Sequence, residues 1–315
     1  MTTCRIWIPS KQKYQRFLEM KCEQYRAILK SVDDDNDFDF VLNQVILQCC
    51  QEPDVRLEQY TIIDRFVLLL QLKIHSHTSH LKLTRICEKC QEETQFNIDL
   101  NKVIEDLATT IDKPFRQEFQ SGGTTVLCDI PYVCALDEPS PVDRNDLDAR
   151  LTQYLYSFIQ SLEIHEHDID LNTLARDQKH TVCGSLPFEI LNRIKREFID
   201  PIHATLKDLL LITHRCGECG DELKVGFDIH NMTDACRILF RDDSAINVLS
   251  LYANVSSQCH FDFNFYKNLT PAELLLIYNS LSSKEKPPED PGEKDFLEEY
   301  RGGPKGMVES PSEFL

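Results

Sequence analysis

Two Cys-x-x-Cys pairs are the residues of this sequence whose type and spacing point most clearly to chemistry. Cys87 and Cys90 form the first pair, and Cys216 and Cys219 form the second. Two thiolates separated by two residues can reach one metal ion from a single turn, and two such turns complete the tetrahedral site that zinc prefers. A bound cation also lowers the pKa of its thiol ligands, so all four can bind as thiolates at neutral pH. We therefore expect Cys87, Cys90, Cys216 and Cys219 to hold one structural Zn²⁺.

The expected zinc site is closed, and it is split along the chain. Four thiolates fill the tetrahedron and leave no position for water, so the ion would stabilise the fold and would not catalyse a reaction. About 125 residues separate Cys90 from Cys216, against roughly 15–20 in a compact zinc ribbon. We expect a zinc ribbon interrupted by an inserted subdomain. Two alternatives stay open: unrelated turns with free cysteines, and a redox pair, which the lack of a βαβ pattern around either motif disfavours.

Other polar clusters have simpler explanations than catalysis. His75, His77 and His80 have no nearby carboxylate and are typical of a polar helix end, while His165-Glu166-His167-Asp168 is typical of a solvated acidic surface. Neither cysteine pair has the H-x-E and P-C-x-x-C context of zinc deaminases. Phosphate-binding, dinucleotide-binding, G-x-S-x-G and H-E-x-x-H motifs are absent from the sequence. We therefore predict no catalytic residue and no organic cofactor site, and we do not expect an enzyme.

Charge and composition narrow the class of protein further. The 315 residues carry a formal net charge of −18, which repels phosphate and disfavours general nucleic-acid binding. Thirteen cysteines without a signal-peptide pattern indicate a reducing compartment, with thiols that are buried or bound to metal. The most apolar run, 62–74, contains charged residues and is not expected to span a membrane.

Hydrophobic periodicity predicts the elements that must position the cysteines. The first half should contain a strand at Arg5–Pro9, a helix from Ser10 to Leu29, a helix with Phe40 and Cys49 inward, a buried helix at Leu57–Ile74, strands at Leu81–Ile86 and Thr94–Leu100, and a hairpin turn at Gly122-Gly123. The second half should contain a loop at Leu136–Asn145, a helix at Leu147–Leu162, helices over Leu186–Ile212 with a break near Pro201, a strand at Leu223–Ile229, and helices at Thr233–Phe240, Ala245–Val255 and Pro271–Leu281.

The expected fold class is α+β, helix-rich, with four regions. Residues 1–100 would form an N-terminal helical region with the first cysteine knuckle, and residues 101–185 the inserted subdomain. Residues 186–281 would supply further helices, the second knuckle and the closing helices. Residues 282–315 are charged and proline-rich, with few large apolar side chains, which predicts a disordered, flexible acidic tail.

The order of these features resembles the baseplate hub assembly proteins of T-even-type contractile-tailed phages. A family phrase of the type D-x-x-x-L-x-L-x-I-R-x-x-S has its counterpart in Asp64–Ser76, with Leu72 and Lys73 at the isoleucine and arginine positions. Three more segments are also similar to the family: the opening strand and helical region (Ile6–Ser31), the segment Phe38–Leu57, and the strand-knuckle-strand unit Leu81–Leu100. The end of the ordered chain is similar in its helix near Asn247–Ala253, its segment Phe261–Leu269 and its helix that starts Thr270-Pro271-Ala272-Glu273. The middle, from about Asn101 to Ser185, has no counterpart.

This resemblance implies a structural or assembly protein of the virion. It would be a component of the tail baseplate hub, or a hub assembly factor, that works through contacts with other tail and baseplate proteins and not with a membrane. Its place would be the virion baseplate or the cytoplasm of the infected host. Two other hypotheses stay open: a zinc-ribbon adaptor in transcription or nucleic-acid transactions, which would need a basic patch such as 191–196, and an enzyme that uses the His/Glu cluster at 165–168.

Overall fold

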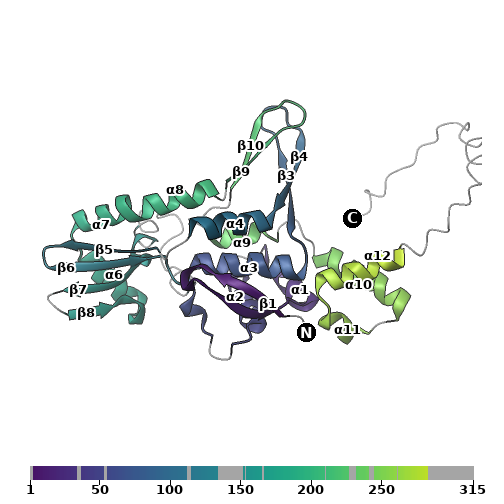
Figure 1. The fold of residues 1–315 in the computed structure, drawn as a ribbon, viewed down its shortest axis with the longest axis horizontal. Coiled ribbons are helices and arrows are strands. Elements are labelled where there is room, and N and C mark those ends of the chain that lie inside the picture. The colour runs from purple at the N-terminus through teal and green to yellow at the C-terminus, as the bar shows by residue number, and fades with distance from the viewer. Residues whose placement is uncertain are drawn as a thin grey trace, which may run out of the picture.

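The structure, a computed structural model, combines helices with small antiparallel sheets around a long central helix (Figure 1). It describes residues 3–33, 37–52, 55–111, 115–133, 152, 154–164, 167–209, 211–226, 232–240, 245–260 and 262–282. Some of the expected features lie outside these described residues: the loop at Leu136–Asn145, most of the acidic tail, and the residues His165 and Glu166. The mixture of helices and strands confirms the expected α+β class.

The described strands form four antiparallel sheets. Three of these sheets are hairpins, and the fourth is a meander in the order β5-β6-β7-β8. The hairpins are β1 (Thr3–Ile8) with β2 (Lys13–Leu18), β3 (His80–Ile86) with β4 (Glu93–Asp99), and β9 (Leu211–Arg215) with β10 (Glu222–Gly226). The meander consists of β5 (Arg116–Ser121), β6 (Thr124–Asp129), β7 (Ile159–Ile164) and β8 (His167–Asp170).

Helices make up the rest of the described body. They are α1 (Cys22–Ser31), α2 (Phe38–Cys49), α3 (Ile62–Ser76), α4 (Leu100–Thr110), α6 (Arg176–Gly184), α7 (Phe188–Ile194), α8 (Asp200–Leu209), α9 (Met232–Ile238), α10 (Ala245–Cys259), α11 (Phe263–Asn268) and α12 (Pro271–Ser282). Figure 1 shows α7 and α8 in line above the β5–β8 sheet, and α10, α11 and α12 at the opposite end of the molecule.

Helix α3 is the centre of the main core. Every residue from Ile62 to Lys73 is buried, which confirms the expected all-round burial of this segment. The helix begins at Ile62 and not at Leu57, because Thr61 and Asp64 form a capping box at that point. A smaller cluster of Cys22, Val255, Tyr266 and Leu274 fixes α10–α12 against α1.

Three sequence predictions about secondary structure are wrong in part. Lys13–Leu18 is a strand, because its residues pair one to one with β1 and only alternate side chains are buried. Ile159–Leu162 opens the central strand β7 and does not end a helix; residues 154–157 are helical. The chain also passes Pro201 without a break. The five residues 195–199 form a π-turn, in which the Asp200 N–H donates to the Lys195 carbonyl before Pro201 enters the first turn of α8.

Side-chain direction in α2 also differs from the prediction. Phe40, expected to point inward, is 64% exposed, whereas Leu42 is fully buried. Val45, Ile46 and Cys49 lie on the buried face as expected. The hairpin turn at Gly122-Gly123 joins β5 to β6, as the sequence predicts, and both glycines have positive φ.

Asp129, at the end of β6, should make stability depend on pH. Burial raises the pKa of its carboxyl to about 6, although the Ile130 N–H and the charge of Arg116 act in the opposite direction. The folded state therefore holds a proton that the unfolded state releases, so stability should fall as pH rises from about 4 to 6 and then level off. We expect Asp129→Asn to raise the free energy of unfolding at pH 8 by about 2 kcal/mol and to flatten the pH profile, measured by urea unfolding. An unchanged profile would contradict this assignment.

Candidate metal centre

Two β-hairpins from distant parts of the chain form an arm that projects from the body (Figure 1). The β3–β4 hairpin carries Cys87 and Cys90 in its turn, and the β9–β10 hairpin carries Cys216 and Cys219. Three contacts between side chains also link the hairpins: the rings of Phe96 and His214 lie 5.0 Å apart, Lys89 forms an ion pair of 3.8 Å with Asp221, and the Thr94 hydroxyl lies 3.7 Å from the Cys216 sulfur.

The two cysteine turns have the same backbone geometry. The N–H of each leading cysteine donates to a carbonyl five residues later, at 2.8 Å, on Glu92 for Cys87 and on Asp221 for Cys216. The carbonyl of each leading cysteine accepts from the N–H four residues later, on Gln91 at 2.8 Å and on Gly220 at 3.0 Å. Each turn therefore closes on itself and holds its own sulfur pair in place.

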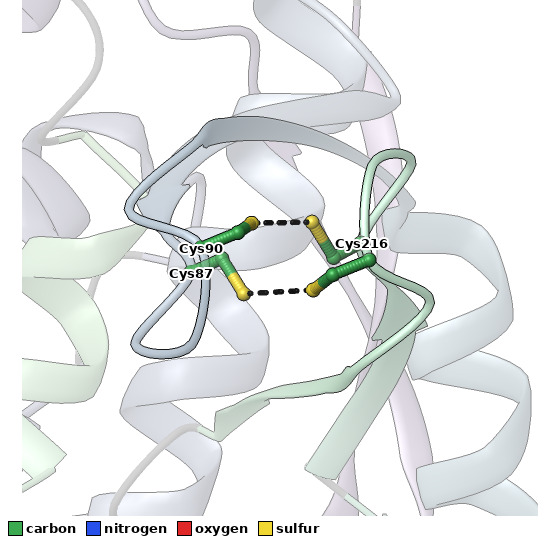
Figure 2. A group of neighbouring side chains, drawn as sticks. Cys87, Cys90 and Cys216 are labelled. Carbon is green, nitrogen blue, oxygen red and sulfur yellow. Dashed lines mark hydrogen bonds between the residues drawn. The ribbon is translucent and has the colours of Figure 1, made fainter.

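The structure brings the four sulfurs together, as Figure 2 shows. All four Sγ atoms lie within 4.8 Å of one another. The Cys87–Cys219 sulfurs are 3.6 Å apart and the Cys90–Cys216 sulfurs 3.5 Å apart. A disulfide needs about 2.05 Å, so the cysteines are free thiols. Four sulfurs at about 2.3 Å from one zinc ion would stand about 3.8 Å apart. The cluster thus has the size and the ligand chemistry to bind a metal ion.

Hydrogen bonds and crowding shift the thiol pKa values in opposite directions. The backbone N–H groups of Cys219 and Glu218 lower the pKa of Cys216 to about 6. The Glu92 N–H also lowers the pKa of Cys90, but desolvation and the neighbouring sulfurs outweigh it and raise that pKa to about 12. Four close thiolates repel one another, and a shared cation removes this repulsion.

The residue that follows each cysteine pair has a left-handed backbone conformation, and its energetic cost can be tested. Gln91 and Gly220 occupy equivalent positions and have φ of 61° and 71°, a left-handed region that costs side chains about 1–2 kcal/mol. No atom lies near the place of an added Cβ at Gly220. We expect Gly220→Ala to lower the free energy of unfolding by about 1 kcal/mol and Gln91→Gly to raise it by about 0.5–1 kcal/mol, measured by urea unfolding of the metal-loaded protein. Effects of the same sign would contradict the equivalence of the two turns.

The histidine clusters do not join the metal centre. His75 lies in the last turn of α3, and His77 ends that helix with its ring 5.1 Å from the Tyr25 ring. His80 begins β3. His167 and Asp168 are exposed on β8. Within the described residues, the metal-ligating side chains that lie close enough together to share one ion are those of the four cysteines.

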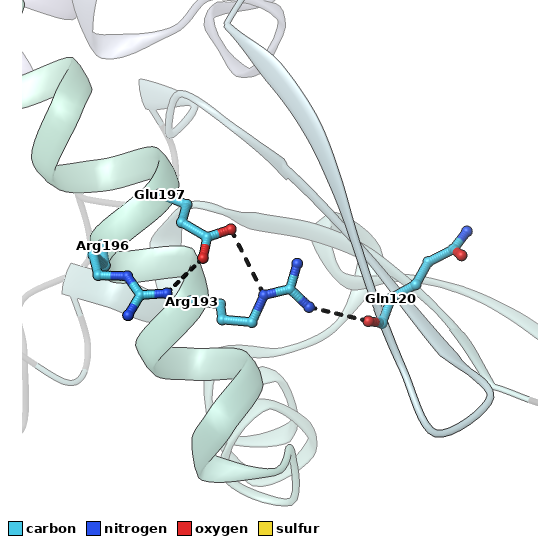
Figure 3. Close-up of polar contacts among 4 residues, drawn as sticks. All are labelled: Gln120, Arg193, Arg196 and Glu197. Carbon is cyan, nitrogen blue, oxygen red and sulfur yellow. Dashed lines mark hydrogen bonds and ion pairs between the residues drawn. The ribbon is translucent and has the colours of Figure 1, made fainter.

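The basic segment 191–196 is neutralised by neighbouring acids (Figure 3). Arg193 forms an ion pair of 3.6 Å with Glu197 and donates to the Gln120 carbonyl at 3.2 Å. Arg196 pairs with the same Glu197 at 2.7 Å. Outside the figure, Lys195 pairs with Asp200 at 2.9 Å. The contact from Arg193 to Gln120 joins α7 to β5. Because Arg193, Lys195 and Arg196 each pair with Glu197 or Asp200, they do not form an unpaired basic surface.

Some positioning residues were not identifiable from the sequence. Phe96, His214, Lys89 and Asp221 join the two hairpins, but each partner lies more than a hundred residues from the other in the chain. Asp64 is fully buried, where it receives hydrogen bonds from Ser10 and Thr61. Its place at the start of the phrase Asp64–Ser76 is the one sequence signal that pointed to it.

No helix in the described part of the chain has both the length and the apolar character to cross a membrane. No curated protein and no solved structure matches the chain. One family model does match, that of the T4 bacteriophage base plate protein, over residues 1–234. The match covers the central helix, all four cysteines and the middle region 101–185, so the expectation that this middle has no counterpart in the family is wrong. The closing segments from Asn247 onward lie outside the match. It favours a structural role in the virion tail, among other tail and baseplate proteins. The chain belongs to the T4 bacteriophage base plate protein family.

Proposed function

We propose that this chain is a component of the phage baseplate hub, or a factor that assembles the hub, and that it acts through protein contacts and not through catalysis. Membership of the baseplate family supports the assembly role. The observation that carries the proposal is the arm, where Cys87, Cys90, Cys216 and Cys219 meet at the junction of two hairpins. An arm held rigid at its cross-link suits a protein that must present a fixed surface to neighbouring subunits.

We further propose that the four cysteines hold one structural zinc ion. Soft thiolate ligands in a tetrahedral set select zinc over calcium or magnesium, which prefer oxygen. With four protein ligands, the ion would have no open position for a substrate or water. Its contribution would be to lock the β3–β4 hairpin to the β9–β10 hairpin, because an isolated two-stranded hairpin is marginally stable in water.

The division of the chain into 1–100, 101–185, 186–281 and 282–315 stays part of the proposal. The arm gives this division a rationale, because the segment between the two knuckles holds the whole β5–β8 sheet. In this view the zinc ion joins the chain before residue 91 to the chain after residue 215, and the inserted region with its sheet folds between these two points.

The alternative, a zinc-ribbon adaptor for nucleic acid, has less support. It requires a basic surface, and its best candidate, the segment 191–196, has each of its charged residues paired with Glu197 or Asp200. The formal net charge of −18 also repels a phosphate backbone.

A phage that lacks this chain provides the functional test. We expect its lysates, viewed by electron microscopy, to lack complete baseplates, and we expect the wild-type chain supplied in trans to restore them. Mass spectrometry of purified virions then separates a permanent hub component from an assembly factor that leaves. Normal tails in the absence of the chain would contradict the proposed function.

A further inference from the structure

The outer face of the β1–β2 hairpin places two arginines side by side. Arg5 on β1 pairs in register with Arg16 on β2, and both side chains are exposed. Trp7, two residues along β1, exchanges hydrogen bonds with the Gln71 side chain and not with β2. Arg5 and Arg16 therefore form a non-hydrogen-bonded pair, the type in which opposite side chains stand closest, with Cα atoms about 4.5 Å apart.

No salt bridge neutralises this pair of like charges in the described part of the chain. Neither Arg5 nor Arg16 forms an ion pair there. Like charges directly opposite each other on a sheet are destabilising. The chain is rich in acidic residues, with a net charge of −18, yet none of the described acids forms a salt bridge with these two arginines. The basic residues of α7 show the contrast, because Glu197 and Asp200 neutralise them.

The two arginines line a groove whose other residues suit a protein partner. The groove has a volume of about 770 Å³ and is lined by Arg5, Tyr14, Arg16, Leu18, Cys50, Gln51 and Glu52. Tyr14 is 67% exposed, and the half-buried Leu18 lies on the same face of β2, on the other side of Arg16. Glu52 is the one acid in this lining, and it accepts a hydrogen bond from Gln15 at 3.0 Å. Arginine and tyrosine are the residue types that most often dominate the energy of protein interfaces.

We propose that this groove, formed by β1, β2 and residues 50–52, binds an acidic segment of a partner protein. Carboxylates of the segment would pair with the guanidinium groups of Arg5 and Arg16, and apolar side chains before and after those carboxylates would pack on Tyr14 and on Leu18, which flank Arg16 on β2. Arginine suits this role because its planar fork can hold a carboxylate with two hydrogen bonds. The groove lies outside the cysteine cluster, so the proposal does not depend on the metal ion.

A short fluorescein-labelled peptide of glutamate and leucine tests the proposal by fluorescence anisotropy on the full chain. We expect binding that weakens with added salt, and a dissociation constant at least about tenfold higher for the double variant Arg5→Glu with Arg16→Glu. The double variant Arg5→Lys with Arg16→Lys should keep part of the affinity, because it keeps the charge but loses the fork.

The matched control is Lys30→Glu with Lys102→Glu, which changes the net charge equally at two exposed positions elsewhere. This control should bind the peptide as the wild type does. Three results would overturn the proposal. The wild type could fail to bind the peptide, or both glutamate double variants could weaken binding equally. The third is that Arg5 and Arg16 bind single-stranded DNA more tightly than the peptide. Metal content and melting temperature, measured on each variant, report separately on the zinc centre and the fold.

Discussion

Replacing Cys90 with serine is expected to release the metal ion and to unfold the arm. Cys90 is exposed, so serine removes little packing, and the loss of a thiolate ligand becomes the dominant effect. Because metal binding and folding are coupled in structural zinc sites, we expect the arm to lose about 5 kcal/mol or more of stability. Elemental analysis of the purified variant measures the metal, and hydrogen exchange of the amides in β3, β4, β9 and β10 measures the stability of the arm.

A cysteine outside the cluster provides the control for this variant. Cys259, at the end of α10, is a half-buried free thiol, and Cys259→Ser should retain both the metal and the protection of the arm. Most of the large core around α3 comes from residues outside the arm, so the slowly exchanging amides of α3 should change less than those of the arm. A Cys90→Ser protein with full metal content and unchanged exchange in the arm would show that the sulfurs hold no ion.

Replacing Asp64 with alanine is expected to produce the second large effect, a loss of about 3 kcal/mol in the free energy of unfolding. The Asp64 carboxylate is fully buried and accepts hydrogen bonds from the N–H and hydroxyl of Ser10 and from the N–H of Thr61. It thus caps α3 and ties the chain after β1 to that helix. Removal would leave the buried Thr61 N–H and the half-buried Ser10 donors without their acceptor, which costs more than the net value of a hydrogen bond.

Urea unfolding measures this loss, and Asp168→Ala is the control. Asp168 is exposed on β8, and its removal should change the free energy of unfolding by less than about 0.5 kcal/mol. Asp64→Asn should fall between the two, because its amide oxygen can still accept a hydrogen bond. Equal stability of Asp64→Ala and Asp168→Ala would contradict the anchoring role of Asp64.

The four cysteines that meet in the arm could be singled out from the sequence because their signal is local. A Cys-x-x-Cys turn is set by short-range backbone geometry, and the two turns have the same hydrogen bonds at equivalent positions. The burial of α3 was equally predictable, since eight of the twelve residues from Ile62 to Lys73 are apolar. The strands on either side of Cys87 and Cys90 followed from their alternating pattern.

The errors arose where pairing with a neighbouring strand decides the conformation. Tyr14, Phe17 and Leu18 fit both helical spacing and strand alternation, and pairing with β1 selects the strand. Ile159–Leu162 likewise becomes a strand because β6 and β8 flank it. The cross-strand pairing of Arg5 with Arg16 depends on the register of that same hairpin, so it was not evident from their positions in the chain.

The most direct test of the account is the sulfur coordination of the metal in the purified full-length chain, measured by X-ray absorption at the zinc edge together with elemental analysis. We predict one zinc ion per chain, with four sulfur neighbours at about 2.3 Å. Such a shell requires Cys87 and Cys90 to share their ion with Cys216 and Cys219. A chain purified without chelators that contains no metal, or zinc surrounded by nitrogen and oxygen, would contradict the proposal that this ion joins the two hairpins.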